Sequence, residues 1–285
     1  MRFAITCSDR YLGVFDAFVE AGWQPLRLFG VPCDGRMFRN SASIERAKSL
    51  GIGIQLSRIV DADLERLADE GCEALVVASY QWRILGWESR LRYAVNFHPS
   101  LLPAYRGPYP LLNGLRDRVP TWGVSCHKLA PEFDAGDILA QRAFAVDADE
   151  THETLDLKSQ MALRRLAREV AADFQPLWDG ARAQGQGSAA PLLGDDERRI
   201  DFKQGVAQIL HRIRVFGRFE CLAEVNGATL HVARAAGWVE AHGDAPGTVV
   251  HAYALTTVVA CRDGYIALLE WHLFAPLLVT GTPPR

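Results

Sequence analysis

Asn96 and His98 lie two residues apart at the end of an apolar run, in the sequence "AVNFHPSLLPAYRG". On an extended strand, residues two apart project from the same face, so we expect Asn96 and His98 to share a face and Phe97 to point to the other. An amide and an imidazole placed together can both donate to an oxygen that gains negative charge during a reaction. A structural alternative stays open at this point, in which both side chains only cap the loop that follows.

Asp134 lies in an acidic turn, "PEFDAGD", that Gly136 closes. Alone, an Asp followed closely by Gly is typical of a structural turn. Beside Asn96 and His98, however, a carboxylate completes a set of groups suited to transferring a small acyl group to an amine. It raises the pKa of a neighbouring imidazole, fixes its orientation and accepts the amine's proton, directly or through water. We therefore predict that Asn96, His98 and Asp134 form a catalytic group.

Ser100 offers a competing chemistry, because a serine in this loop could act as an acyl nucleophile. Neither a GxSxG motif nor a second nearby histidine accompanies it, so the sequence argues against that mechanism. The first apolar run is likewise not followed by a GxGxxG motif, which leaves a dinucleotide site unsupported.

Expected strands and helices alternate around these residues. Strands are expected at 2–8, 25–31, 52–56, 73–79, 94–98, 121–129 and 136–146. Helices are expected at 11–21, 42–50 and 61–71, and a longer one carries the apolar stripe Leu163, Leu166, Val170, Phe174 and Leu177. This alternation predicts an α/β fold with a parallel sheet covered on both faces, whose functional residues gather at the carboxyl ends of strands.

The composition changes after residue 180. Residues 181–199 are rich in Gly, Ala and polar residues, so we expect a linker there, between domains at 1–180 and 200–285. A helix is expected over 200–216. The remainder alternates, with hairpin turns expected at Asn226-Gly227 and Asp263-Gly264. The pattern predicts a small antiparallel β domain, most simply a compact barrel.

The overall composition excludes several classes of protein. The 285 residues are 49% hydrophobic and carry a net charge of −3, so no global basic field attracts nucleic acid. The six cysteines are far apart and lack CxxC spacing, which predicts reduced thiols rather than a disulfide framework or a metal site. The first apolar run is too short for a signal peptide or a membrane span, and we expect a cytoplasmic protein without membrane contact.

These motifs together resemble those of the folate-dependent formyltransferases. That family contains glycinamide ribonucleotide transformylase, methionyl-tRNA formyltransferase and the sugar N-formyltransferases. "NFHPSLLPAYRG" is similar to the family's N-x-H-x-SLLP signature, and "PEFDAGDIL" is similar to its D-x-G loop. "SYQWRIL", residues 79–85, resembles the loop that grips the pterin of 10-formyltetrahydrofolate, largely through backbone groups. The resemblance runs in order through residues 1–178, and the tail from Ile200 resembles the C-terminal domain of the methionyl-tRNA branch.

The resemblance implies a Rossmann-like formyltransferase domain with a mostly parallel sheet, followed by an OB-like β-barrel. It implies that Asn96 and His98 donate to the formyl oxygen, and that Asp134 is the acid/base partner that keeps His98 charged. The implied co-substrate is 10-formyltetrahydrofolate, with no metal. Its expected contacts are Tyr80, Trp82, Arg83, Ile84, Leu85, Glu132, Phe133 and Gly136.

The acceptor amine is less well specified. The methionyl-tRNA enzymes usually carry a longer basic loop after the second strand, where this chain has "VPCDGRMFRNSAS", residues 31–43. From Ile200 onward, seven Lys and Arg face seven Asp and Glu, which gives no net attraction for phosphates. We therefore predict a small amine acceptor, either an amino sugar linked to a nucleotide or an N-hydroxyornithine. Its expected contacts are Ser8, Asp9, Arg10, Tyr105, Arg106 and Tyr109.

Two other functions stay open. Methionyl-tRNA formyltransferase is the main alternative, with tRNA contacting a local basic stripe on the "HRIRVFGR" helix. A non-catalytic folate-binding protein is the alternative from another class, although the intact set of Asn96, His98 and Asp134 argues against it. The sequence indicates no oligomeric state.

Overall fold

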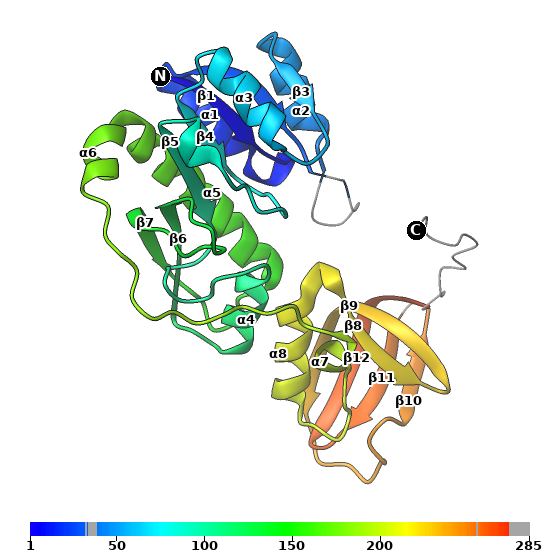
Figure 1. Ribbon diagram of the computed structural model, residues 1–285. Helices are drawn as coiled ribbons and strands as arrows, with labels where there is room; N and C mark the ends of the chain where they lie inside the picture. Colours follow the sequence, from blue (N-terminus) through cyan, green and yellow to red (C-terminus); the bar gives the residue numbers. More distant parts are fainter. Residues whose placement is uncertain (32, 34–38, 255, 274–285) are drawn as a thin grey trace. The chain divides into compact units, whose positions relative to one another are not determined.

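The computed structural model describes residues 1–31, 33, 39–254 and 256–273. The chain divides into two compact units, residues 1–192 and 193–285 (Figure 1). Residues 32 and 34–38 of the short loop at 31–43, whose length and charge bear on the acceptor, lie outside the described residues. Among the described residues, no helix is both long enough and apolar enough to span a bilayer.

The first unit is built on a seven-stranded sheet in the order β3-β2-β1-β4-β5-β6-β7. The strands are β1 Arg2–Thr6, β2 Gln24–Phe29, β3 Gly53–Gln55, β4 Ala74–Val77, β5 Tyr93–His98, β6 Thr121–Lys128 and β7 Ile138–Ala145. The first five strands pair in parallel, whereas β6 runs antiparallel to β5 and β7 antiparallel to β6. The predicted α/β fold with a mostly parallel sheet is confirmed.

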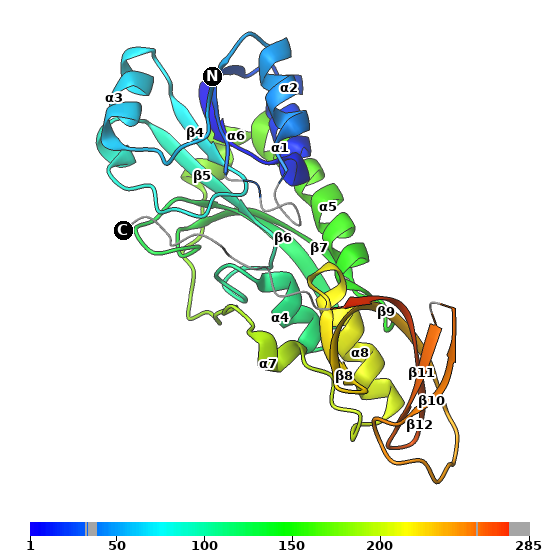
Figure 2. The same ribbon diagram turned by 90° about the vertical axis from the view of Figure 1, so that its right-hand side faces the viewer.

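Helices cover both faces of this sheet, as Figure 2 shows for α1 and α5 on one side and α3 on the other. The helices of the unit are α1 Leu12–Glu20, α2 Ser41–Ser49, α3 Asp61–Asp69, α4 Pro110–Arg116, α5 His152–Ala172 and α6 Phe174–Asp179. The apolar stripe predicted as one long helix is split between α5 and α6. Pro176 explains the break, because it has no N–H to donate to the carbonyl of Ala172 and its ring clashes with that carbonyl.

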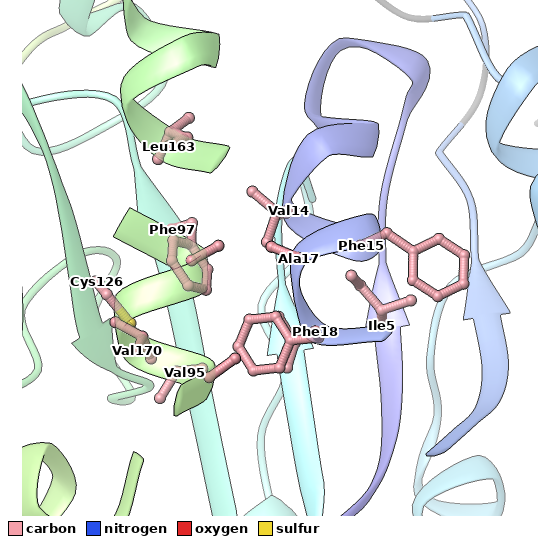
Figure 3. Packing of buried hydrophobic residues seen from close by; sticks show 14 of the residues in the cluster. Ile5, Val14, Phe15, Ala17, Phe18, Val95, Phe97, Cys126, Leu163 and Val170 are labelled. Carbon is pink, nitrogen blue, oxygen red and sulfur yellow. The ribbon is translucent and has the colours of Figure 1, made fainter. Parts of the chain in front are cut away.

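Alternation along β5 decides which way the site residues face. Phe97 packs into the larger core with Phe18 of α1, their ring centroids 5.9 Å apart (Figure 3). Ala94, on the opposite face, belongs to the second core cluster beside α3. Asn96 and His98 lie an even number of residues from Ala94, so they share its face, as the sequence predicted.

The second unit is a five-stranded antiparallel sheet in the order β10-β11-β12-β9-β8. Its elements are α7 Asp195–Arg198, α8 Val206–Phe216, β8 Cys221–Val225, β9 Ala228–Val239, β10 Val249–Tyr253, β11 Thr256–Cys261 and β12 Gly264–Leu273. The small antiparallel β domain is thus confirmed. The helix expected from residue 200 begins only at Val206, because Gly205 interrupts it and the Asp263 carboxylate accepts from the Val206 N–H (2.8 Å).

The two predicted hairpins differ in their turns. Asn226 and Gly227 both have positive φ, 50° and 78°, as a two-residue turn between β8 and β9 requires. The other hairpin turns one residue earlier than expected, at Arg262 and Asp263, and Gly264 already pairs in β12. A Cβ on Gly264 would lie 2.1 Å from the Trp238 carbonyl oxygen, so this glycine serves close strand packing.

The segment expected to be a linker, 181–199, is partly built into the first unit. Arg182 and Ile138 exchange two backbone hydrogen bonds, of 2.8 and 2.9 Å, which extend the edge of the sheet at β7. Farther along, the Arg106 N–H donates to the Ser188 carbonyl (2.9 Å) and the Ala190 N–H to the Arg106 carbonyl (2.6 Å). Backbone pairing thus fixes a stretch that composition alone favours as loose.

Candidate active site

The predicted catalytic residues meet at the ends of three strands. Antiparallel pairing of β5 with β6 places Asn96 opposite His127 and His98 opposite Ser125. Asp134 comes from the turn between β6 and β7, with its backbone in the left-handed region (φ 56°). Few non-glycine residues adopt this conformation, although Asp tolerates it better than most. The local conformation therefore helps to direct the carboxylate toward the end of β5.

The Asp134 carboxylate is the centre of the group. Its Oδ1 accepts a hydrogen bond from Asn96 Nδ2 (3.1 Å). The same oxygen lies 3.4 Å from His98 Nδ1 and 3.5 Å from His127 Nε2. The backbone N–H of Gly107 donates to Oδ2 (2.9 Å). One carboxylate therefore faces two imidazoles, an amide and a backbone donor, and we call Asp134, Asn96, His98 and His127 the Asp134 cluster.

The ring nitrogen of each imidazole that points away from Asp134 also makes a hydrogen bond. His127 Nδ1–H donates to the Lys128 carbonyl (2.7 Å), which leaves Nε2 to accept from Asn96 Nδ2 (3.0 Å). His98 Nε2–H donates to the carbonyl of Tyr105 (2.9 Å), a residue with a φ of 59°. The amide and imidazole donors expected at a formyl oxygen thus have internal partners, and an incoming oxygen must replace one of them.

Asp134 is ionised. Burial alone would raise the pKa of its carboxyl group, but His98, His127 and the Gly107 N–H outweigh burial and lower that pKa to about 2. The carboxylate is therefore a weak base with a stable negative charge. Its position at Nδ1 of His98 suits it to orient the imidazole and to stabilise a proton arriving at that ring.

His98 has a lowered pKa. Burial is the largest cause and outweighs the raising effects of the Asp134 carboxylate and the Tyr105 carbonyl. Because the ordinary value is 6.5, the imidazole is mostly neutral at pH 7. This differs from the expectation that Asp134 keeps His98 charged, since the sequence could not show that the ring is only 6% exposed.

Two supporting residues were missed by sequence reasoning. His127 lies on an apolar strand and shows its role only through its register opposite Asn96. Gln184 lies in the expected linker, and its Nε2 donates to the carbonyls of Asp134 (2.9 Å) and Gly136 (2.6 Å). Its Oε1 accepts two hydrogen bonds from the guanidinium of Arg106. Gln184 therefore joins the Asp134 turn to the loop that follows β5.

Gly136 has a steric reason for its identity. A Cβ at this position would lie 1.9 Å from the Lys128 carbonyl oxygen, closer than any real contact. The glycine lets the turn between β6 and β7 close tightly, and the closed turn positions the backbone of Asp134.

The two loops expected to hold the folate are in contact with each other. The guanidinium of Arg83 lies over the ring of Phe133, 5.1 Å from its centroid. Phe133 and Leu85 are both about half exposed, at 47% and 53%, and offer apolar surface. Glu132 is exposed beside Phe133.

Other residues of the first folate loop turn inward. Ile84 is buried in the core beside α3, so only its backbone is available to a ligand. The Tyr80 hydroxyl accepts from the Ile59 N–H (2.7 Å), and the Tyr80 ring meets Trp82 edge to face. These positions fit a loop that contacts a ligand mainly through its backbone.

Three of the residues expected to contact the acceptor, Ser8, Asp9 and Arg10, have structural partners. Arg10 is ion-paired with Asp156 of α5, which is 1% exposed. Asp9 accepts from the Ser43 N–H (2.8 Å) and from the hydroxyl of Ser41, at the start of α2. Ser8 is fully buried and bonds to the Ser79 hydroxyl (3.2 Å). Their expected contacts with an acceptor stay predictions, and Arg10 in particular is held by another charge.

The other three residues expected to contact the acceptor, Tyr105, Arg106 and Tyr109, are all partly exposed. Tyr105 and Tyr109 are both partly exposed, and the Tyr105 hydroxyl donates to Asp117 (3.0 Å). Arg106 is partly exposed and is held by Gln184. Ser100 is fully buried, and its hydroxyl donates to the Ala104 carbonyl (2.7 Å), which argues against a role as nucleophile.

Comparison with known proteins gives matches to both units. The model of the "Formyl transferase" family matches residues 44–167, and that of the "Formyl transferase, C-terminal domain" matches residues 193–274. A methionyl-tRNA formyltransferase of Anaeromyxobacter dehalogenans is 29% identical, over 94% of this chain and 88% of its own length. Alignments to other proteins of that description span only 58–61% of their length.

Solved structures share the fold. HypX from Aquifex aeolicus, in a variant form, superimposes with a TM-score of 0.74 at 16% identity, over 95% of this chain and 45% of its own. An N-formyltransferase from Helicobacter canadensis, crystallised with folinic acid and dTDP-3-aminofucose, gives 0.65 at 13% identity, over 95% of this chain and 99% of its own. Both family models match in order along one chain that also brings Asn96, His98 and Asp134 together, and this chain therefore belongs to the formyl transferase family, a family of folate-dependent enzymes.

Proposed function

We propose that this protein is an N-formyltransferase that moves the formyl group of 10-formyltetrahydrofolate to the amine of a small acceptor. The observation that carries the proposal is that Asn96 Nδ2 and His98 Nδ1 lie 3.1 and 3.4 Å from the same oxygen, Oδ1 of Asp134. The three come from β5 and a turn 36 residues beyond it, so the fold rather than local sequence brings them together. A binding protein without catalysis does not require this set.

The residues around the cluster fit the folate. Exposed apolar surface on Leu85 and Phe133, with Arg83 across the Phe133 ring, suits a flat conjugated ring system beside a carboxylate tail. The backbone of residues 79–85 would hold the pterin. When bound, 10-formyltetrahydrofolate supplies a formyl group activated toward attack by an amine.

His98 acts as the proton carrier in this proposal. Its imidazole is mostly neutral at pH 7, because its pKa lies below the ordinary value, so it is ready to accept a proton from the attacking amine. Asp134 faces Nδ1, which leaves Nε2 as the atom that takes the proton and later returns it to the leaving nitrogen. For this step the proton that Nε2 donates to the Tyr105 carbonyl has to move to Nδ1, where the Asp134 carboxylate accepts it, so that the Nε2 lone pair is free.

Asn96 stabilises the developing charge on the formyl oxygen. Its amide already donates to Asp134 and His127, so the same N–H groups are oriented and desolvated in advance. A preorganised amide donor of this kind acts more strongly than one that must first be ordered. The proposal therefore assigns proton transfer to His98 and charge stabilisation to Asn96.

A small amine is the preferred acceptor, because acidic partners neutralise part of the basic charge of the second unit. Arg234 pairs with Glu270 (2.6 Å) and Arg262 with Asp263 (3.7 Å). Ion pairs of this kind reduce the field available for phosphates. The amino-sugar nucleotide and N-hydroxyornithine classes each place a free amine on a compact molecule.

Methionyl-tRNA is the second candidate acceptor. The observation that favours it is the alignment of the Anaeromyxobacter dehalogenans methionyl-tRNA formyltransferase along 94% of this chain, including the C-terminal domain. A tRNA acceptor needs several phosphate contacts, which the partly exposed side of α8 would have to supply.

Salt dependence separates the two acceptors. We expect efficient formylation of an amino-sugar nucleotide or N-hydroxyornithine, with kcat/KM changing by less than about threefold between low and physiological salt, since few ionic contacts form. Six or more phosphate contacts to tRNA would instead cost roughly a thousandfold in affinity over a fourfold rise in salt. Steeply salt-dependent formylation of methionyl-tRNA, with neither small amine used, would select the second candidate. Failure of all three acceptors would reject formyl transfer to these amines.

A further inference from the structure

Three residues of the second unit, far apart in sequence, converge on its sheet. Glu220 precedes β8, His231 lies on β9 and His272 lies on β12. His231 and His272 are direct partners across the antiparallel β9–β12 ladder. Two register shifts between Leu268 and Trp271 set that pairing. Cross-strand partners share a face of the sheet, so the two imidazoles lie side by side.

Glu220 completes the group, and we call these three residues the Glu220 cluster. Its Oε2 is 3.0 Å from His231 Nδ1 and its Oε1 is 3.4 Å from His272 Nδ1. The imidazole rings stack with centroids 5.0 Å apart and planes 17° from parallel. The ligand atoms of all three residues lie within 4.8 Å of one another, and within the described parts of the chain this is the one cluster with such a geometry.

We propose that the Glu220 cluster binds a divalent transition-metal ion, with Zn²⁺ as the best match. Two imidazole nitrogens and one carboxylate are a donor set that Zn²⁺ accepts at bonds of about 2.0–2.2 Å. Ligands of a tetrahedral ion with such bonds are about 3.3 Å apart. His231 Nδ1 lies 3.0 Å from Oε2 of Glu220 and His272 Nδ1 lies 3.4 Å from Oε1, and the three ligand atoms lie within 4.8 Å of one another. A rotation of His272, whose side chain is 59% exposed, would bring its nitrogen to the same ion.

Arg198 holds the backbone from which the Glu220 side chain projects. The guanidinium of Arg198 donates to the backbone carbonyls of Phe219 (2.9 Å) and Glu220 (3.2 Å). Asp195 offsets the charge of that guanidinium through an ion pair of 2.9 Å, so Arg198 repels a cation at the cluster only weakly. His231 is 8% exposed and Glu220 15%, which places two ligands in the protein and one, His272, at the solvent side.

A metal here has a physical purpose. The unit from residue 193 to 285 is small, and small domains bury too little apolar surface to be strongly stable. An ion held by Glu220, His231 and His272 ties the segment before β8 to β9 and β12. Water would take the fourth coordination position, on the exposed side of the ion. The role that we assign to the ion is to stabilise the sheet by linking these three segments. No sequence spacing reveals the cluster, because 11 and 41 residues separate its members.

The test is zinc titration of the full-length chain. The protein carries no histidine tag and is freed of metal with a chelator, and Cys33→Ser removes the exposed thiol as a competing ligand. We expect one Zn²⁺ per chain by calorimetry, and tetrahedral Co²⁺ absorption when cobalt replaces it. Glu220→Gln and His272→Ala should each weaken binding at least about a hundredfold, since even groups behind a ligand cost 10–100-fold.

His251→Ala is the matched control, because His251 is an exposed histidine on β10 of the same unit and outside the cluster. Its zinc affinity should equal that of the parent. Circular dichroism checks that His272→Ala, a change at an exposed side chain, leaves the sheet intact. Absence of stoichiometric zinc binding in the parent would overturn the proposal. So would equal binding by the parent and His272→Ala, because the ion would then lie elsewhere.

Discussion

Within the described parts of the chain, two carboxylates each face a pair of imidazoles, and the two groups differ in what surrounds them. In the Asp134 cluster both rings are nearly buried, and their outer nitrogens donate to the carbonyls of Tyr105 and Lys128. In the Glu220 cluster one ring, His272, is 59% exposed. The same side-chain types therefore suit different chemistry.

Burial and hydrogen bonds decide that difference. At Asp134, the carboxylate accepts hydrogen bonds from the Asn96 amide and the Gly107 N–H and also faces the two imidazoles. These contacts fix the orientation of the carboxylate and the rings, which suits them to proton transfer. At Glu220, the two rings stack and each presents Nδ1 to one of the two carboxylate oxygens, at 3.0 and 3.4 Å. Similar side chains can therefore support different chemistry, depending on the hydrogen-bond donors and the burial around them.

The largest expected effect comes from removing the proton carrier of the Asp134 cluster. His98→Ala should lower kcat for formyl transfer by at least about a hundredfold, because a positioned acid/base group contributes 10²–10⁴-fold. Steady-state turnover of 10-formyltetrahydrofolate measures it, with His251→Ala as the control that keeps the parent rate. A rate for His98→Ala within a few-fold of the parent would remove His98 from the mechanism.

Removing the amide should cost less. Asn96→Ala is expected to lower kcat by about tenfold to a hundredfold, somewhat below the cost of a complete oxyanion contact, because water can partly replace the amide. The acceptor KM should change little. If KM rises while kcat stays at the parent value, Asn96 serves binding rather than charge stabilisation.

The pH profile of formyl transfer reports the protonation states of His98 and Asp134. Because the pKa of His98 is lowered, kcat/KM should fall only below pH 6.5 and be level at pH 7, and Asp134, with a pKa of about 2, should stay ionised throughout. Asp134→Asn should move this acidic limb to lower pH, because the carboxylate raises the pKa of His98. An acidic limb centred above pH 6.5 would show that the catalytic imidazole is charged instead.

Stability should follow the same groups. The folded pKa of Asp134 lies below its ordinary value of 3.8, so its contribution is present above that pH and is lost as the pH falls toward 2. His98 also binds its proton less readily in the folded state, so its neutral form is favoured and stability falls as the pH drops below 6.5. Denaturant titration of the parent and of His98→Ala across this range measures both contributions.

A smaller effect is expected at Gln184, which supports the Asp134 turn from the segment at 181–192. Gln184→Ala removes the hydrogen bonds to the Asp134 and Gly136 carbonyls and those that Arg106 donates to Gln184. It should lower kcat by about three- to tenfold through misplacement of the carboxylate. Gln184→Glu keeps the length but loses the donor, so it should not restore the rate. Full activity in both variants would show that the turn holds its shape alone.

The smallest effect is expected at Tyr105. Tyr105→Phe removes only a hydroxyl that bonds Asp117 at the surface, so the free energy of unfolding should fall by about 0.5–1 kcal/mol and kcat should stay within twofold of the parent. The carbonyl of Tyr105 at His98 Nε2 is unaffected by this change. A large loss of kcat would mean that the phenol itself contacts the substrate.

Sequence reasoning found the residues of the Asp134 cluster that lie in motifs and missed those that depend on tertiary pairing. Asn96 and His98 were placed on one face because a strand alternates every two residues. His127 was missed because its antiparallel register opposite Asn96 is set across a long connection. Gln184 was missed because Gly and Ala around it indicate a linker, whereas backbone pairing fixes that segment.

The sequence also could not predict which charged side chains pair in the fold or which residues are buried. Nothing in the sequence shows that Arg10 meets Asp156, 146 residues away, or that Ile84 packs into the core. The neutral state of His98 likewise follows from burial, a property of the folded chain. The α/β unit and the small antiparallel unit could be predicted, because alternation and turn residues are local signals.

Formyl transfer by Asp134 and its neighbours is the activity that we propose. The most direct test is the rate at which Asp134→Asn forms tetrahydrofolate from 10-formyltetrahydrofolate with the best small amine acceptor, compared with the parent and with His251→Ala. We expect a loss of at least about a hundredfold for Asp134→Asn, with its fold retained, and the parent rate for His251→Ala. A rate for Asp134→Asn within a few-fold of the parent would contradict it.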